Sequence, residues 1–401
     1  MNSPRTIKIG ERLKAPVSSV PLLDVGRGNN PLKDEFRAAF DEILETGRFV
    51  GGPFCQQLEE QVATATDAKF AVGCASGSDA LLLALMAINI QPGDRVICPS
   101  FTFFATASAI HRLGAVPVFA DIIPGTFNLD PEHVESLITP STKAIIPVHL
   151  FGQCANMDAM LDMAQRYGVK IIEDCAQSIG ANWKGQGSGS LGSIGCFSFY
   201  PTKNLGGFGD GGMLTTNDEQ LADRIRLLAN HGMRPRYYHS EVGINSRLDS
   251  IQAAMLCVKM KHLDACSGGR QQNADNYDAL FAASDLMSQI ALPQRDPNCE
   301  HVWNQYTIRI QNAEISRDEV REQLGQRGVG SEIYYPVPLH QQECFQDLGY
   351  ATGSLPHTEA AAETVLSLPI FPELTFAEQQ YVVESLAEVL NAAGDSGRQA
   401  A

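Results

Sequence analysis

The stretch CFSFYPTKNLGGFGDGG, residues 196–212, contains a short apolar run, one lysine and a glycine-rich loop, and a second apolar run follows at residues 213–216. We expect a buried strand that ends just before Lys203 and a loop that leads into another strand. A charged lysine is costly at a buried strand end, whereas a Schiff base with an aldehyde removes its charge. Lys203 is therefore predicted to bind an aldehyde cofactor covalently, with a solvated loop lysine as the alternative.

The glycines of this loop also match the GxGxxG spacing of dinucleotide-binding proteins, at Gly207, Gly209 and Gly212. In such proteins the fingerprint follows a strand and opens a helix. Here the glycines precede an apolar run at residues 213–216 that reads as a strand. The match is therefore interpreted as coincidental.

Outward from this stretch, short β-branched apolar runs alternate with helical patterns over roughly residues 36–266, which predicts an α/β fold. Their continuous apolar character indicates strands that are buried on both faces. A chain of 401 residues with 44% apolar composition can bury a sizeable core. The other predicted strands are residues 69–72, 95–98, 116–119, 144–148 and 169–172.

The pattern changes after Cys266, where longer helical segments surround few strands. We predict a large domain over residues 20–265 and a smaller α+β domain over residues 266–393. Residues 1–18 and 394–401 are expected to be mobile ends. The expected elements of the smaller domain are helices at residues 270–283, 317–327 and 375–390 and a strand at residues 306–310.

The net charge of −16 argues against nucleic-acid binding, which needs clustered Lys and Arg. Ten cysteines without a CxxC pair support neither a metal site nor a disulfide framework, and favour a reducing cytoplasm. The N-terminus lacks the apolar core of a signal peptide. No apolar stretch approaches the roughly 20 residues that span a bilayer, so no membrane partner is expected.

Two carboxylates, Glu173 and Asp174, stand at the end of an apolar strand, where ligands bind in α/β sheets. Because neighbouring strand residues point to opposite faces, only one of them can face a ligand. A buried carboxylate opposite a pyridine nitrogen keeps that ring cationic, and Asp174 fits this role, with a helix-capping or ion-paired Asp as the alternative. His149, at the end of another apolar run, is interpreted as a framework residue.

The turn at residues 73–81 opens an amphipathic helix. Amides at a helix N-terminus together with hydroxyl groups form an anion site, so this turn and Ser198 are predicted to bind a phosphate, with an ordinary capped helix as the alternative. Residues 101–104 end a strand with three phenylalanines, one of which could stack on a cofactor ring. Core packing explains the other two.

Together these motifs resemble the sugar-nucleotide aminotransferases of the DegT/DnrJ/StrS type. The resemblance covers roughly residues 21–390 and implies an aspartate-aminotransferase-like fold of type I, with a mixed, mostly parallel sheet in the large domain. It also implies pyridoxal 5'-phosphate as cofactor. It is carried by Gly-Ser-Asp at a helix start, Glu-Asp-x-Ala-Gln after a strand, Ser-Phe-x-Pro-x-Lys, and Gly-x-Asn-Ser-Arg-Leu-Asp-x-x-Gln-Ala-Ala at residues 243–254.

The resemblance also assigns roles to single residues. It implies that Lys203 forms the Schiff base, that Asp174 pairs with the pyridine nitrogen and that Gln177 lies beside the ring. It further implies a homodimer with shared active sites. The remaining implied cofactor contacts are Gly77, Ser78 and Ser198 on the phosphate, Phe103 stacked on the ring, and Asn245 reaching the phosphate from the partner subunit.

Some members have Trp at the stacking position and Thr where this chain has Ser78, and both differences preserve the chemistry. The implied reaction moves an amino group from glutamate, which becomes 2-oxoglutarate, to a nucleotide-linked keto sugar. Expected substrates include 3-keto sugars linked to UDP or dTDP, for the amino sugars of polysaccharides, lipopolysaccharides or glycosylated metabolites. The predicted substrate contacts are Arg247, Tyr334 and His340, with a structural role as the alternative for each.

Three alternatives remain at this point. Dehydratases of the same fold replace the lysine with histidine, so Lys203 favours transamination. A cofactor-binding sensor without turnover would retain the same residues. A nicotinamide enzyme would bind NADH and would not be yellow.

Overall fold

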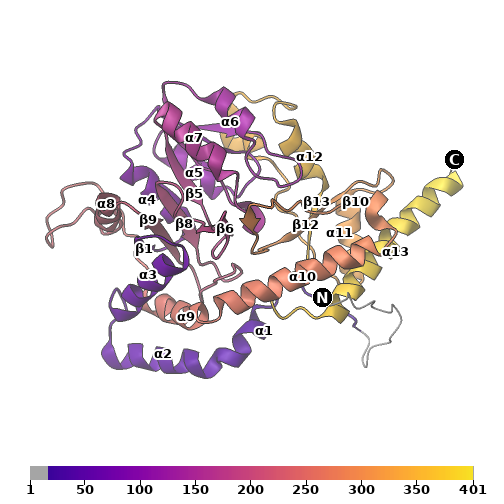
Figure 1. Cartoon of the computed structure of the whole chain (residues 1–401), viewed down its shortest axis with the longest axis horizontal. Helices are drawn as coiled ribbons and strands as arrows, with labels where there is room; N and C mark the ends of the chain where they lie inside the picture. The colour runs from indigo at the N-terminus through magenta and orange to yellow at the C-terminus, as the bar shows by residue number, and fades with distance from the viewer. Residues whose placement is uncertain (1–16, 401) are drawn as a thin grey trace.

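A computed structural model of the chain describes the backbone of residues 17–400 and the side chains of residues 17–393. Its central sheet has seven strands in the order β1-β9-β8-β5-β4-β2-β3 (Figure 1). All run in one direction except β9, which is antiparallel to its neighbours β1 and β8. The strands are β1 (Phe70–Cys74), β2 (Arg95–Pro99), β3 (Val116–Ala120), β4 (Thr142–Ile145), β5 (Lys170–Asp174), β8 (Ile194–Ser198) and β9 (Gly212–Thr216). The predicted α/β class with a mixed, mostly parallel sheet is confirmed.

Helices cover both faces of this sheet. Val96 and Cys98 of β2 share a cluster with α4, α5 and α8, whereas Ile97 between them packs with α6 and α7. At the other half of the sheet, Phe197 and Met213 pack with α3 and α9. Double coverage explains why the strands are continuously apolar. The helices are α3 (Pro53–Ala65), α4 (Gly77–Ala87), α5 (Ala105–Arg112), α6 (Pro131–Leu137), α7 (Met157–Tyr167), α8 (Glu219–Ala229) and α9 (Ser250–Met260).

A second core surrounds a small antiparallel sheet of β10 (Ile290–Ala291), β12 (Tyr306–Ile310) and β13 (Val365–Leu368). The helices α10 (Leu263–Ala282), α11 (Arg317–Gln326) and α13 (Phe376–Ala400) pack around it. In Figure 1, α10 runs from α9 under the central sheet toward α13, and so connects the two cores. The large side chains Tyr277, Trp303 and Tyr306 are fully buried there.

Two segments pack in a core whose other residues come from a distant part of the chain. Val20, near the N-terminus, is fully buried in the second core and forms backbone hydrogen bonds with Gly328 and Gly330. Leu339 and Phe345, late in the chain, instead pack in the core of the central sheet. The domain boundary at residues 265 and 266 therefore stays a prediction.

Both predicted ends also stay predictions. Residues 1–16 and 401 lie outside the described part of the chain, and the backbone of residues 394–400 continues α13. Across the part that the structure describes, no helix is long and apolar enough to cross a membrane. The remaining elements include α1 (Val25–Asn29), α2 (Lys33–Thr46), α12 (Pro356–Thr364), and a three-stranded sheet of β6 (Asn182–Trp183), β7 (Gln186–Gly187) and β11 (Cys299–Glu300).

Candidate active site

The residues predicted to carry chemistry follow strands that point the same way. Asp174 ends β5, Lys203 follows β8, Phe103 follows β2, and Gly77 begins α4 after β1. Because these four strands are oriented alike, their carboxyl ends meet at one edge of the sheet. This edge is where ligands bind in open α/β sheets.

Lys203 is half-buried in the turn after β8. Burial lowers the pKa of its amine from 10.5 to about 8, although the charge of Asp174 favours the protonated form. Among the described residues, none forms a hydrogen bond with its side-chain nitrogen. At neutral pH a larger fraction of the Lys203 amine is therefore neutral than in an ordinary lysine, as an attacking nucleophile requires.

Asp174 is buried, and each of its oxygens has one donor from the protein. The hydroxyl of Thr106 donates to Oδ2 at 2.9 Å, and the amide of Ala176 donates to Oδ1 at 3.2 Å. Burial raises the pKa of the carboxyl, while these two bonds and the nearby Lys203 lower it. A carboxylate oxygen has room for a further donor, so Asp174 can accept one from a bound ring nitrogen.

The start of α4 lies directly against the end of β8. A Cβ added at Gly77 would lie only 2.6 Å from the Cβ of Ser198, so only glycine fits there. Ser76 caps the helix by accepting a hydrogen bond from the amide of Asp79. The first-turn amides together with the exposed Ser78 and the half-buried Ser198 form a cradle suited to an anion.

Gln177 has a fixed orientation beside Asp174. Its Oε1 accepts from the amide of Phe151 at 2.6 Å, so its Nε2 must donate, and it donates to the Tyr335 hydroxyl at 3.3 Å. The Tyr335 ring lies 6.3 Å from that of Phe103, whose side chain is 58% exposed. Phe103 therefore presents an accessible ring at this edge, as stacking on a ligand would require.

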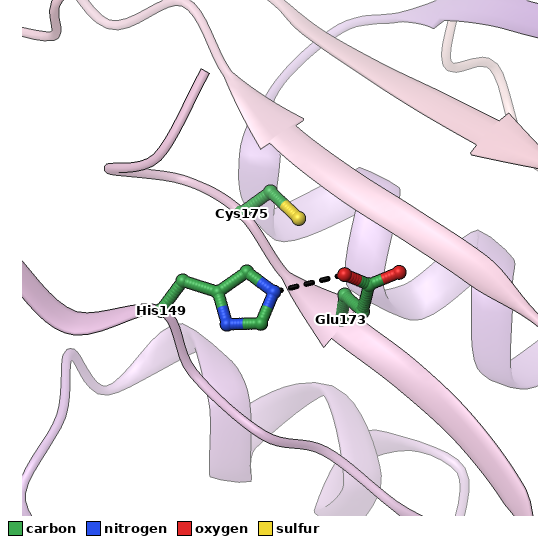
Figure 2. A group of neighbouring side chains, drawn as sticks. All are labelled: His149, Glu173 and Cys175. Carbon is green, nitrogen blue, oxygen red and sulfur yellow. Dashed lines mark hydrogen bonds and ion pairs between the residues drawn. The ribbon is translucent and has the colours of Figure 1, made fainter. Parts of the chain in front are cut away.

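Glu173 points to the other face of the sheet, as predicted, and bonds with His149 near Cys175 (Figure 2). Its other acceptor positions bind the amides of Gly189, Leu191 and Gly192. The second nitrogen of His149 accepts from an amide, that of Ala155. The polar atoms of Glu173 and His149 already have protein partners, and burial raises the pKa of the Cys175 thiol, which disfavours the thiolate that a metal would bind. That this buried trio holds no metal stays a prediction.

His340, a predicted substrate contact, lies inside a hydrogen-bonded cluster, and its role as a substrate contact stays a prediction. Its imidazole is fully buried, with Nδ1 bonded to the Ser100 hydroxyl at 2.7 Å and Nε2 to Glu359 at 3.2 Å. Burial lowers the pKa of the ring. These two bonds tie the segment that precedes α12 to Ser100 and to Glu359 of α12. The neighbouring residue Tyr334 is half-buried, and its role as a substrate contact stays a prediction.

Asn245, the predicted partner-subunit residue, and Arg247, a predicted substrate contact, lie on one segment after α8. Asn245 forms a bridge with Asn230 after α8, and Arg247 donates to the Asn230 side chain at 3.0 Å. Ser246 between them accepts from the amide of Ala75 in the turn before α4 at 3.1 Å. Asn245 and Arg247 are both exposed and available to another molecule.

The sequence did not point to Thr106 as a partner of Asp174. Thr106 follows β2 in the chain and Asp174 ends β5, and β4 lies between these two strands in the sheet. Only the fold therefore brings the two residues together. The same holds for Tyr335, which lies in the chain between α11 and α12, far from Gln177. No local pattern marks either residue.

These side chains fit a phosphate-bearing aromatic aldehyde with a ring nitrogen. Lys203 offers the amine, Asp174 the anion for the ring nitrogen and Phe103 a stacking face. The close approach at Gly77 leaves a cradle of amides and hydroxyls for the phosphate. A lysine amine without a hydrogen-bond partner, close to a buried carboxylate, is the arrangement expected for pyridoxal phosphate.

Comparison with known proteins gives a consistent result. The model of the "DegT/DnrJ/EryC1/StrS aminotransferase family" matches residues 30–387. A "pleiotropic regulatory protein" of Geobacillus stearothermophilus is 48% identical over 92% of this chain and 98% of its own length. A "UDP-N-acetyl-3-dehydro-alpha-D-glucosamine 3-aminotransferase" of Acidithiobacillus ferrooxidans is 45% identical over 89% of this chain and 94% of its own. The solved structure of NtdA from Bacillus subtilis "with bound cofactor PMP" superposes with a TM-score of 0.87 at 35% identity, over 94% of this chain and 86% of that one.

Proposed function

The chain belongs to the DegT/DnrJ/EryC1/StrS aminotransferase family, and we propose that it transfers an amino group from glutamate to C3 of a keto sugar linked to UDP or dTDP. The observation that carries this proposal is that the Lys203 amine has a lowered pKa, lies near the buried Asp174 and has no hydrogen-bond partner among the described residues. The Acidithiobacillus relative is named for amination at C3 of a UDP sugar, which supports the choice of substrate.

The cofactor of this reaction is pyridoxal 5'-phosphate, and PMP in the Bacillus structure is its amino form. The residues that would hold it are Lys203, Asp174, Gln177, Phe103, Gly77, Ser78 and Ser198, with Asn245 of a second subunit. When bound, it supplies a cationic ring that withdraws electrons from the carbon next to the transferred nitrogen.

The residues of this chain have separate tasks in the transfer. Asp174 accepts a hydrogen bond from the ring nitrogen and stabilises its proton. Lys203, once its amine is free, takes a proton from one carbon and returns it to the other, which a base with a pKa near 8 can do in both directions at neutral pH. Gln177 stays fixed by Phe151 and Tyr335 beside the ring.

The remaining parts of the proposal concern the setting of the reaction. We place Arg247 on an anionic part of the sugar nucleotide and Tyr334 beside the sugar. The active unit is a homodimer in the cytoplasm that makes amino sugars for polysaccharides or glycosylated metabolites. Ten free cysteines, most of them buried, support a reducing compartment.

A panel of UDP- and dTDP-linked keto sugars, incubated with the purified protein, pyridoxal phosphate and glutamate, tests the reaction. We expect an amino sugar and an equal amount of 2-oxoglutarate with at least one 3-keto sugar. Arg247→Ala should raise KM for the sugar about ten-fold or more, because a charge-assisted bond is lost. The half-reaction with glutamate should change less than about two-fold. Equal loss in both halves would contradict the proposed role of Arg247.

The two rival functions have distinct outcomes in the same assay. A dehydratase would release water from the sugar without forming 2-oxoglutarate, and Lys203 disfavours it. A cofactor-binding sensor would bind pyridoxal phosphate and aminate no sugar. We retain this alternative because the Geobacillus relative is named as a regulatory protein.

A further inference from the structure

Thr106 is a fully buried residue in the first turn of α5, and its hydroxyl bonds to Oδ2 of Asp174 at 2.9 Å. We propose that Thr106 is a positioning residue that holds Asp174 as an oriented anion for the ring nitrogen of the cofactor. This inference rests on the proposed function, since it requires pyridoxal phosphate beside Asp174. It adds to the site a residue that does not itself touch the cofactor.

The direction of the bond follows from the number of available protons. An ionised carboxylate can only accept, so the single hydroxyl proton of Thr106 is directed to Asp174. The Thr102 hydroxyl lies 3.5 Å from that of Thr106 and must be the donor in this contact. Two buried hydroxyl groups are therefore aligned in series toward Asp174.

Thr106 is the sole side chain that bonds to this carboxylate among those of residues 17–393. His149 is near, but its Nε2 donates to Glu173, and only its backbone amide bonds to the Asp174 carbonyl oxygen. The other carboxylate bond comes from the Ala176 amide, which is two residues along the same chain. Thr106 is therefore the contact that ties the carboxylate to a separate element.

The surroundings of Asp174 make such a donor necessary. Three buried thiols, those of Cys98, Cys175 and Cys196, lie near it, and burial raises the pKa of each, so they remain uncharged. Burial also raises the pKa of Asp174 itself. The Thr106 hydroxyl counteracts this effect and favours the anion, which the ring nitrogen needs as its partner.

Two cofactors separate positioning from a general structural role. One is pyridoxal phosphate, and the other is its 1-deaza analogue, in which a C–H group replaces the ring nitrogen. Lys203 can bind both through the same aldehyde, so that contribution cancels in the ratio of their dissociation constants. The ratio therefore measures the contribution of the contact between Asp174 and the ring nitrogen to the binding free energy.

The experiment compares wild type with Thr106→Val, which keeps the shape, and Thr106→Ser, which keeps the hydroxyl. Cofactor is removed from the holoenzyme, and each cofactor is titrated back while visible absorbance is followed. Thr106→Val should lower the preference for pyridoxal phosphate about ten-fold or more, because a hydrogen bond to a charged group is lost. Thr106→Ser should stay within about two-fold of wild type.

Three outcomes overturn the inference. Equal weakening of both cofactors by Thr106→Val would show a structural role, and unchanged binding of both would show no role. Failure of the serine variant to restore the preference would exclude the hydroxyl as the cause. Thr106→Ala also lacks the hydroxyl and should give the same ratio of dissociation constants as Thr106→Val. It replaces the valine variant in the comparison if that variant does not fold. If wild type itself forms no Schiff base with either cofactor, the proposed function fails, which is a different result from all of these.

Discussion

At the scale of single residues, two lysines near the active site have the same lowered pKa but different surroundings. Burial lowers the pKa of both Lys203 and Lys259 to about 8. Lys259 donates to the Gly206 carbonyl at 2.6 Å, whereas the amine of Lys203 has no such partner among the described residues. Lowered pKa alone therefore does not select the reactive lysine, and Lys259 serves as an internal comparison.

Reduction of the reconstituted enzyme with borohydride, followed by peptide mapping, should place the pyridoxyl group on Lys203 and not on Lys259. The rate of cofactor attachment should rise with pH and level off above about 8, because only the neutral amine attacks. Lys203→Ala should abolish the visible absorbance, and Lys259→Met should retain it. A label on Lys259 would refute the assignment of Lys203.

The sequence allowed Lys203 and Asp174 to be predicted because each stands beside a recognisable local pattern. His340 has no such pattern, and its polar ring looked equally suited to a sugar or to a packed interior. Its two partners, Ser100 and Glu359, come from distant parts of the chain. Burial of this kind depends on tertiary contacts, which a local sequence pattern does not contain.

At the scale of elements, β5 ends in two carboxylates with different roles: Glu173 binds framework groups, and Asp174 is proposed to bind the ring nitrogen of the cofactor. Glu173→Gln would turn an amide NH₂ toward donors already bound to Glu173, which we expect to destabilise the protein by about 2–4 kcal/mol. Asp174→Asn should leave stability within about 1 kcal/mol, because the hydroxyl of Thr106 can turn to accept. It should slow turnover by orders of magnitude, because the ring nitrogen loses its anionic partner.

Chemical denaturation of both variants, together with turnover assays, measures this contrast. Asp174→Asn with near-normal turnover would make Asp174 a framework residue. Glu173→Gln with wild-type stability would instead show that the loop at residues 187–192 does not depend on the carboxylate.

The junction of α4 and β8 gives a second prediction at this scale. Gly77→Ala would place a methyl group 2.6 Å from Ser198, which should destabilise the protein by about 1–3 kcal/mol and weaken binding of pyridoxal phosphate. The matched control is Gly268→Ala in α10, where nothing lies within 4 Å of the added carbon. That change should be neutral or stabilise the helix by about 0.5–1 kcal/mol. Thermal unfolding and cofactor titration report both effects, and equal behaviour of the two variants would contradict the close approach.

Strand positions were predictable because strands covered on both faces are apolar at every residue. The strand predicted at residues 116–119, for example, is β3 at Val116–Ala120. The predicted run at residues 144–148 was less accurate, because β4 ends at Ile145. Residues 146–149 still form backbone hydrogen bonds with Ile97 and Asp174, and their side chains stay buried, so composition does not mark where the regular strand ends.

At the scale of the whole molecule, Asn245 is exposed, as a residue that completes a neighbouring subunit's site would be before assembly. In a two-fold dimer each subunit would give Asn245 and receive it. Lys203→Ala and Asn245→Asp should each be inactive as pure dimers, the second because a carboxylate faces the phosphate. A mixed dimer would contain one intact site.

The two variants can be unfolded and refolded together, and their transamination compared with that of each refolded alone. About half of the refolded dimers should be mixed, each with one working site, so about one quarter of wild-type activity should return. The presence of mixed dimers must be verified by distinct tags. Mixed dimers that remain inactive would disprove the shared site.

The burial of Val20 has a consequence for synthesis on the ribosome. This residue belongs to a core that otherwise consists of residues from 274 onward, and its backbone partners lie at Gly328 and Gly330. Val20 therefore leaves the ribosome before the rest of this core and cannot reach its final place until its partners at Gly328 and Gly330 have been translated. During that interval an apolar segment is exposed to chaperones and proteases, while the central sheet can already assemble.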